Sequence, residues 1–402
     1  MKPSPDLEIK QKLTALLGAE AVSPMTEHGF RGEPWLVLPE TEAVLATVLR
    51  LAHQNCWRVL PMGAGSKLRW GGLVREVELV VSLARLDPLI EHATGDLTVT
   101  VAAGMPLARL QEHLKSAGQF VALDPAYPTT ATLGGILATA DSGSLRHRYG
   151  GVRDLCLGLT VIRADGERAK CGGRVVKNVA GYDLMKLFTG SYGTLGIISQ
   201  MTLRLYPIPP ASQTLCLQGS AANLTQALLA VGNSTLTPSA VDIIANDGLG
   251  LALGFQSTPA GVAQQVAQFL SLGQALGLTV KPYTGPEIWQ GAERVVCKVG
   301  VPVTAAVALA GLVTQLGGVA VLHGGGGMGH IRVMPEIMHL QKLRTFCEGV
   351  GGYLSILEAP TTLKETFDVW GYKGNALGLM ERIKKQFDPL ALLSPGRFVG
   401  GI

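Results

Sequence analysis

The sequence predicts an α+β fold divided between two domains, and three observations support that prediction. The chain has 402 residues, more than one hydrophobic core usually organises. Hydrophobic residues make up 47% of the chain and charged residues 16%, so apolar material suffices for two packed interiors. Helical and strand-like patterns follow one another along the chain, and a proline cluster, Pro207, Pro209 and Pro210, interrupts them near the middle.

The part before the prolines, residues 1–208, is predicted to form the first domain. It opens with two amphipathic helices and then alternates between strands and helices. The predicted helices cover residues 7–20, 40–53 and 107–118, and the predicted strands cover residues 57–60, 77–83, 97–106 and much of the stretch 155–205. Within that last stretch, Asp165-Gly166 is typical of a hairpin turn.

The part after the prolines, residues 212–365, is predicted to form a smaller α/β domain. Its predicted helices cover residues 221–232, 260–277 and 304–317, and its predicted strands lie near residues 240–255, 293–301, 318–322 and 330–334. The remaining residues, 366–402, contain a predicted helix that ends at Asp388-Pro389.

Composition excludes several classes of protein. The net charge is +4, from 34 basic and 30 acidic residues without a basic block, so no nucleic-acid partner is expected. The six cysteines form no CxxC pair, so free buried thiols are favoured over a zinc site, an iron–sulfur cluster or a redox disulfide. The first residues do not resemble a leader, and no apolar run reaches the length of a membrane span. A soluble cytoplasmic protein is therefore expected.

Three glycine-rich segments are the most informative feature of the sequence. The first, PMGAGSK at 61–67, follows a predicted strand and would let backbone N–H groups turn towards an anion such as a pyrophosphate. Its spacing fits neither a Rossmann fingerprint nor a Walker loop, and alone it is better explained as a hairpin turn. The second segment, 129–154, is too rich in small residues for a plain core helix, and the third, 181–207, carries further glycines before an apolar strand.

In their order and spacing, these segments resemble the FAD-binding domain shared by vanillyl-alcohol oxidase, D-lactate dehydrogenase and the flavin subunits of glycolate oxidase. The run KNVAGYD at 177–183 is similar to the FAD-binding E subunit of bacterial glycolate oxidase, and FDPLALLSPGR resembles the ends of such chains. The resemblance implies a PCMH-type FAD-binding domain over residues 1–208, with two lobes divided near residue 85. Residues 212–365 would be the cap domain, and 366–402 would return to the FAD-binding domain.

The resemblance also implies which residues hold the cofactor. Residues 61–67 would wrap the FAD pyrophosphate, while residues of the second segment would lie along the ribityl chain and the isoalloxazine ring, and Ile197 would contact the adenine or flavin edge through its backbone. The implied residues are Pro61, Met62, Gly63, Ala64, Gly65, Ser66, Lys67, Thr132, Gly134, Gly135, Ala138, Ser142, Gly143 and Ile197. Relatives with covalent flavin often use a histidine in or near the first loop. That loop here has neither His nor Cys, so non-covalent FAD is expected.

A possible catalytic centre follows from a second motif. In catalytic relatives, HxGDGNxH and a later Glu supply ligands for a divalent metal. This chain has two histidines at the same separation, His323 and His330, with Glu358 downstream. Gly326 and Met328 stand where the family has Asp and Asn, so two unrelated histidines in a glycine loop are favoured over a working metal site.

Oxidation of a 2-hydroxy acid also needs a cation for the carboxylate and groups that donate hydrogen bonds. Arg332 and Lys373 are candidates for the carboxylate, and Tyr182 and Tyr372 are candidate donors. Each of these side chains is equally compatible with a role on the surface or in packing.

Three functions remain open at this point. The first is the FAD-binding subunit of a glycolate oxidase complex, which would oxidise glycolate to glyoxylate with a second flavin subunit and an iron–sulfur subunit, and would reach a membrane only through its partners. The second is a self-sufficient FAD-dependent dehydrogenase for D-lactate or glycolate. The third is a flavin-bound scaffold without turnover.

Overall fold

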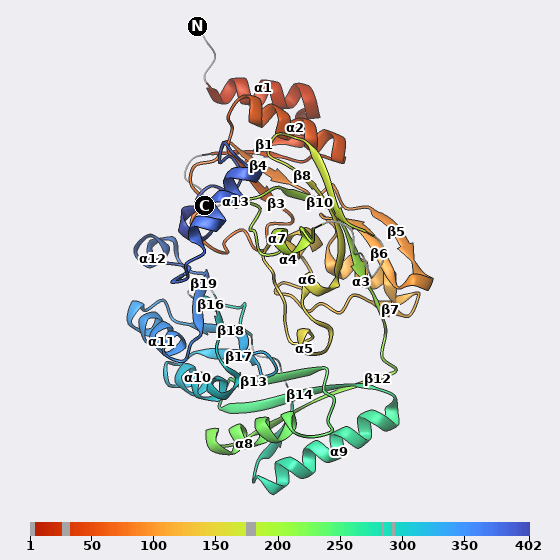
Figure 1. The fold of residues 1–402 in the computed structure, drawn as a ribbon, viewed down its shortest axis with the longest axis vertical. Coiled ribbons are helices and arrows are strands. Elements are labelled where there is room, and N and C mark those ends of the chain that lie inside the picture. Colours follow the sequence, from red (N-terminus) through yellow and green to blue (C-terminus); the bar gives the residue numbers. More distant parts are fainter. Residues whose placement is uncertain (1–4, 26–32, 174–181, 284, 286, 292–293) are drawn as a thin grey trace.

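The computed structural model describes residues 5–25, 33–173, 182–283, 285, 287–291 and 294–402. It confirms a mixed α+β fold, in which two larger sheets and a two-stranded sheet, β7 (Gln119–Phe120) with β11 (Tyr206–Pro207), precede one large sheet built from the second half of the chain (Figure 1).

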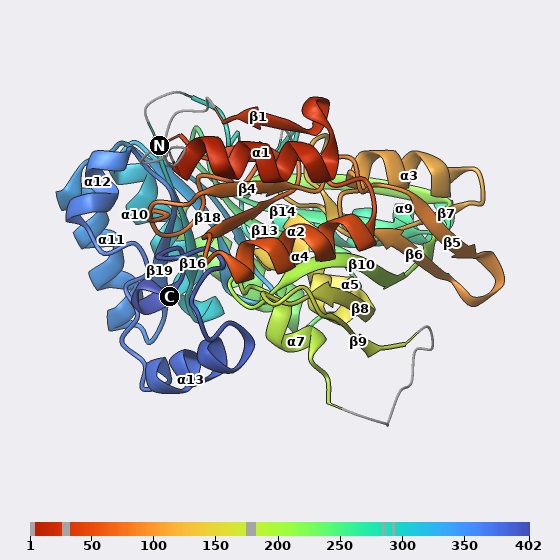
Figure 2. The ribbon, with the colours of Figure 1, turned by 90° about the horizontal axis from the view of Figure 1, so that it is seen from above.

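The first sheet has the strand order β1-β2-β4-β3, formed by β1 (Val22–Pro24), β2 (Trp35–Val37), β4 (Leu79–Ser82) and β3 (Val59–Met62). The helices α1 (Pro5–Leu17) and α2 (Glu42–Gln54) lie beside it (Figure 2). Helix α2 begins at Thr41, whose side-chain oxygen accepts a hydrogen bond from the Val44 N–H at 3.2 Å. Its buried residues, Leu45, Val48, Leu49 and Ala52, recur at helical spacing and therefore form one apolar face.

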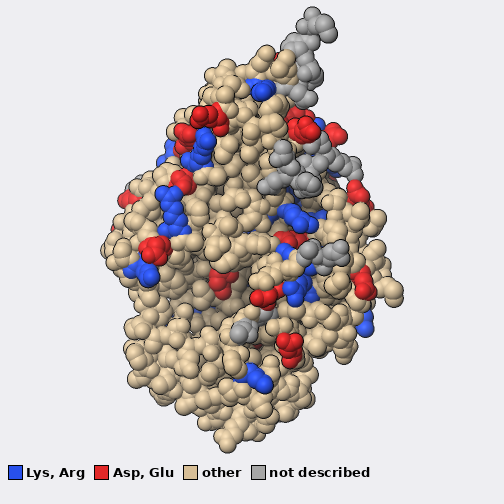
Figure 3. Space-filling model, turned by 180° about the vertical axis from the view of Figure 1, so that it is seen from behind, with Lys and Arg blue, Asp and Glu red and all other residues tan. Residues whose placement is uncertain are grey.

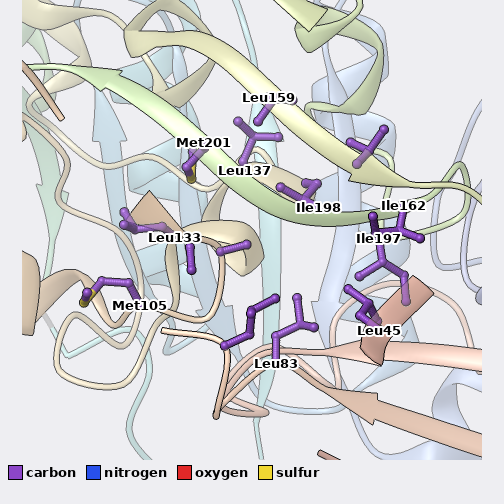
Figure 4. Packing of buried hydrophobic residues seen from close by; sticks show 14 of the residues in the cluster. Leu45, Leu83, Met105, Leu133, Leu137, Leu159, Ile162, Ile197, Ile198 and Met201 are labelled. Atoms are coloured by element: carbon purple, nitrogen blue, oxygen red, sulfur yellow. The ribbon is translucent and has the colours of Figure 1, made fainter. Parts of the chain in front are cut away.

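The second sheet is antiparallel, with the order β5-β6-β10-β8-β9. Its strands are β5 (Leu89–Ala93), β6 (Thr98–Ala102), β10 (Ile197–Arg204), β8 (Cys156–Ile162) and β9 (Arg168–Gly172), and α3 (Leu107–Lys115) and α4 (Leu133–Ala138) accompany them. Side chains from both sheets share one core, in which Leu45 and Leu83 pack near Leu133 and Ile197 (Figure 4). This shared core holds the glycine-rich segments at fixed positions between the two sheets.

The third sheet is antiparallel throughout, so the second domain takes an antiparallel form of the expected α/β arrangement. Its order is β15 (Thr279–Lys281), β12 (Ala211–Gln218), β14 (Leu249–Ser257), β13 (Ala240–Ala245), β17 (Val319–His323), β18 (Met328–Val333), β16 (Val295–Gly300) and β19 (Tyr353–Glu358). The helices α8 (Ala221–Gly232), α9 (Pro259–Ala275), α10 (Val303–Gln315) and α11 (Ile337–Gly349) accompany it at the end of the molecule away from the first domain (Figure 1).

Alternation along these strands gives the third sheet two different faces. Val241, Ile243 and Cys297 belong to the core that the sheet forms with its helices. The next residues along the strands, Asp242 and Lys298, contact the first domain instead. This polar face of the sheet also carries apolar side chains such as Ile244 and Val296, and it is turned towards the first domain.

The last segment of the chain returns to the first domain through α12 (Thr361–Thr366) and α13 (Leu377–Phe387) (Figure 1). The Val59 N–H donates to the Leu392 carbonyl, and the Ser394 N–H donates to the Val59 carbonyl, both at 2.8 Å. On α13, Lys384 Nζ donates to the Thr194 carbonyl at 2.8 Å. These bonds place residues 392–397 beside the first glycine loop.

Several surface features bear on the composition analysis. Charged side chains of both signs are interspersed on the face in Figure 3, and few lie on its lower part. All six cysteines are free, but Cys56 is exposed and Cys171 is half-buried, so the expectation of six buried thiols was wrong for these two. Among the described residues, no helix is both long and apolar enough to cross a membrane.

Candidate functional site

A cleft between the two sheets of the first domain collects nearly all of the predicted cofactor residues. Residues from the segments 61–68, 132–139 and 192–198 line it, together with Arg397 near the end of the chain. Every predicted cofactor residue lines it except Ser142 and Gly143. Sequence reasoning missed further lining residues: Leu68, Leu83, Ala103, Thr139, Tyr192, Gly193, Gly196, Ile198 and Arg397.

The first glycine loop meets the second segment across this cleft. A Cβ atom at Gly63 would overlap the hydroxyl of Thr132, so only glycine lets the loop approach so closely. The same hydroxyl accepts the Gly135 N–H at 3.4 Å at the start of α4. The second segment therefore contains a short helix, α4, whose small residues Gly135 and Ala138 lie on the cleft wall.

Two cations line the cleft, Lys67 and Arg397, and no Asp or Glu does so among the described residues. Lys67 Nζ lies 3.1 Å from the Asp141 carboxylate, and both side chains are buried. Burial lowers the pKa of Lys67 and raises the pKa of Asp141. Arg397 has no such acidic neighbour among the described residues, and it donates to the Lys67 carbonyl at 2.7 Å.

Ser142 and Gly143 belong to a turn beside the cleft. The carboxylate of Asp124 holds this turn, because it accepts the Gly143 N–H at 3.2 Å and the Leu145 N–H at 3.0 Å. Burial raises the pKa of Asp124 from its ordinary 3.8 to about 6.

We expect Asp124 to make stability fall as the pH rises from about 4 to about 6. A carboxyl whose pKa is higher in the folded chain binds more protons when folded, so its stabilising contribution is lost as the pH rises through that range. The loss is at most about 3 kcal/mol, since one pKa unit corresponds to about 1.4 kcal/mol. Urea unfolding of the wild type and of Asp124→Asn at both ends of the range measures it. A difference between the two proteins that does not change with pH would contradict the expectation.

A second polar group lies on the face of the third sheet that is turned towards the first domain. His323 Nδ1 and Asp242 Oδ1 are 2.8 Å apart, and Ser144 of the first domain donates to Asp242 Oδ2 at 2.6 Å. His323 Nε2 is buried and has no hydrogen-bond partner among the described residues. The ring centroids of His323 and His330 are 6.5 Å apart. Sequence reasoning missed Asp242, which no motif marks.

His330 is connected to the cleft through its neighbour on the next strand. His330 is paired in register with Lys298, and Lys298 Nζ donates to the Ala140 carbonyl at 3.2 Å. Ala138 and Thr139, which line the cleft, precede Ala140 directly. Burial, helped by the charges of His323 and Lys298, holds the pKa of His330 well below its ordinary value. The neutral His330 imidazole therefore lies beside Lys298, which contacts the residue that follows the cleft wall.

Glu358 is not placed with these histidines. Its carboxylate accepts hydrogen bonds from Trp70 Nε1 at 3.0 Å, from the Tyr127 hydroxyl, and from Arg294 Nη2 at 3.0 Å. In the part of the chain that the structure describes, no three His, Cys, Asp or Glu side chains are grouped to hold a metal ion. The predicted metal set of His323, His330 and Glu358 is therefore not brought together.

The glycines between the two histidines have a packing role. They form the tight connection between β17 and β18, where Gly327 has a φ of +64°. A Cβ atom there would overlap the Val301 carbonyl. Close packing thus accounts for glycine at this position without a metal.

The other predicted catalytic side chains lie apart from the cleft. Tyr182 is 91% exposed. Arg332 donates to the Gln290 carbonyl at 2.9 Å, and Lys373 pairs with Glu348 at 2.6 Å on the surface. The Tyr372 hydroxyl accepts the Ala376 N–H. Most of the KNVAGYD run lies at 174–181, outside the described residues.

Comparison with known proteins supports FAD as the cofactor of this chain. Residues 34–172 match the family model described as an FAD binding domain. The chain is 36% identical over 182 residues to D-2-hydroxyglutarate dehydrogenase of Xanthomonas citri pv. viticola, covering 45% of this chain and 39% of that protein. It is 33% identical over 181 residues to glycolate oxidase subunit GlcD of Bacillus subtilis, covering 45% and 38%. It is 39% identical over 128 residues to subunit GlcE of Escherichia coli, covering 32% and 37%. The chain thus spans less than two fifths of the length of these relatives.

Solved structures show the same fold over nearly the whole chain. Alkyldihydroxyacetonephosphate synthase aligns with a TM-score of 0.75 at 17% identity, over 98% of this chain and 85% of that one. Substrate-bound p-cresol methylhydroxylase also aligns with a TM-score of 0.75, at 15% identity, over 98% and 97%. The predictions of a PCMH-type fold and of FAD as the cofactor are confirmed. The glycine loop that closes on Thr132 and the two cations fit a large dinucleotide with a charged diphosphate.

Proposed function

We propose that this chain is the FAD-binding subunit of a glycolate-oxidase-type complex and oxidises a 2-hydroxy acid, such as glycolate, to the corresponding 2-oxo acid. The observation that carries the proposal is the neutral imidazole of His330, which is paired in register with Lys298, whose side chain contacts the Ala140 carbonyl next to the FAD cleft. The similarity to hydroxy-acid dehydrogenases and to two glycolate oxidase subunits supports it.

In this proposal, bound FAD supplies the acceptor for the hydride that leaves the substrate carbon. Neutral His330 accepts the hydroxyl proton, because a base must be unprotonated before it acts. Lys298 binds the substrate carboxylate: its ammonium has three N–H donors, and one of them is used by Ala140. Lys298 replaces Arg332 and Lys373 in this role, because those two side chains are engaged elsewhere.

The polar face of the third sheet would orient these groups. Asp242 accepts the His323 ring N–H and the Ser144 hydroxyl, so it joins the cap domain to the FAD-binding domain at the substrate side. FAD binds without a covalent link in this proposal, because neither His nor Cys lines the cleft among the described residues. Similarity to both GlcD and GlcE supports partnership with a second flavin subunit, and electrons would leave through an iron–sulfur partner.

Anaerobic mixing of the purified, FAD-loaded chain with a hydroxy acid tests the proposal. We expect glycolate, D-lactate or D-2-hydroxyglutarate to bleach the visible flavin band, with L-lactate as the control. Bleaching by the chain alone would favour the self-sufficient dehydrogenase. Bleaching only after a second flavin subunit is added would favour the complex. If no hydroxy acid reduced the flavin under either condition, the proposal would be contradicted. The scaffold without turnover would then be the remaining function.

A further inference from the structure

Arg397 is held rigidly at the wall of the FAD cleft. Its loop is fixed by hydrogen bonds from the Gly72 N–H to the Arg397 carbonyl and from the Arg75 N–H to the Pro395 carbonyl, both at 2.9 Å. The Arg397 side chain is only 5% exposed, and Nη2 donates to the Lys67 carbonyl at 2.7 Å. Side-chain freedom is therefore already restricted before any ligand binds.

The rest of the guanidinium has no partner. Nε and Nη1 are buried and form no hydrogen bond to any described residue. The other cation of the cleft, Lys67, is paired with Asp141 at 3.1 Å, whereas no described carboxylate pairs with Arg397. Burial lowers the pKa of Arg397 to about 10, so the group still carries its charge at neutral pH. A buried charge with unpaired donors is unfavourable unless an anion neutralises the charge and accepts hydrogen bonds from those donors.

We propose that Arg397 binds the diphosphate of FAD, donating its unpartnered N–H groups to the diphosphate oxygen atoms from beside Lys67 of the first glycine loop. The planar guanidinium presents its donors in the geometry that phosphate oxygens accept. The diphosphate is also the only group of oxidised FAD with a formal negative charge, so it is the part of the cofactor that neutralises a buried cation. The proposal rests on FAD binding and not on hydroxy-acid oxidation, so either can fail without the other.

The test measures cofactor affinity and not turnover. Apoprotein is prepared from the full-length wild type and from Arg397→Met and Arg397→Lys, and FAD, ADP and riboflavin are titrated into each. We expect Arg397→Met to raise the Kd for FAD about 10- to 100-fold and to weaken ADP similarly, because charge-assisted hydrogen bonds are lost. Riboflavin, which lacks the diphosphate, should bind equally well to both proteins. Arg397→Lys should recover only part of the loss, because it keeps the charge without the planar donors.

Thermal unfolding separates this role from a purely structural one. The Arg397→Met apoprotein should be at least as stable as the wild-type apoprotein, because an unpaired buried charge has been removed. Its stabilisation by FAD should be smaller than that of the wild type. Arg153→Met, at an exposed position that does not line the cleft, is the matched control and should leave both quantities unchanged.

Three outcomes would overturn the proposal. Unchanged FAD affinity in Arg397→Met would show that the cofactor does not contact this side chain. An equal loss of FAD and riboflavin would assign the guanidinium to the isoalloxazine ring. A less stable apoprotein with an undiminished response to FAD would assign Arg397 to packing alone.

Discussion

Replacing His330 by asparagine is expected to slow reduction of the bound flavin by the hydroxy-acid substrate by a factor of about 10² to 10⁴. General-base groups usually contribute rate factors of this size, and burial keeps the His330 imidazole neutral and able to accept a proton. The measurement is stopped-flow absorbance of the flavin under anaerobic conditions. Binding of FAD should not change, because His330 does not line the cofactor cleft.

His339→Asn is the matched control for this experiment. His339 lies on α11, beside Glu336 and away from the polar face of the sheet, so its replacement should leave the reduction rate unchanged. If His330→Asn reduced its flavin as fast as the wild type, another group would have to accept the proton. His323 would then be the next candidate, because its Nε2 atom is buried and unpartnered.

The second large effect is expected at Glu358. Glu358→Ala should lower the free energy of unfolding of the FAD-loaded protein by about 3 to 5 kcal/mol, because removing one partner of a buried pair leaves the other unpaired. The pair is Glu358 and Arg294, and the donors Trp70 Nε1 and the Tyr127 hydroxyl would lose their acceptor as well. Urea unfolding followed by tryptophan fluorescence measures the change.

Glu40→Ala provides the comparison. Glu40 forms an exposed pair with Arg85 at 3.2 Å, and loss of such a pair costs at most about 1 kcal/mol. An equally small cost at Glu358 would contradict its role as the acceptor that joins cap and FAD-binding domain. Metal analysis of the same samples adds a further check. If the wild type contained a divalent ion that Glu358→Ala lost, Glu358 would have to be a metal ligand after all.

The possible metal set, over which the sequence favoured two unrelated histidines, shows where a motif stops being informative. The two histidines kept the separation of the family pattern, and Glu358 followed at a plausible distance along the chain. In the sheet, however, Glu358 lies on β19, and β16 separates that strand from the strand of His330. Its carboxylate is used by Trp70, Tyr127 and Arg294. Spacing in sequence does not determine which strands become neighbours.

The functional residues that sequence reasoning missed are also defined by contacts between distant segments of the chain. Asp242 and Lys298 belong to no motif, and these two residues and Arg397 each act on a segment at least 98 residues away in the chain. The segment SPGR at 394–397 offered a weak signal for Arg397, because it resembles the ends of related chains and contains a cation. Nothing in the local pattern showed that this cation would be buried without an acid.

The sequence by itself determined the mixed α+β fold, the order of the glycine segments and the choice of FAD. The fold and the segments depend on local patterns, such as apolar spacing along a helix or strand and glycine-rich turns that follow a strand, and the choice of FAD depends on the resemblance that those segments carry. Only the tertiary structure decided which charges are paired. That Arg397 is left without an acid while Lys67 has Asp141 depends on the burial and mutual distance of side chains from distant segments, and electrostatic energies change steeply with both.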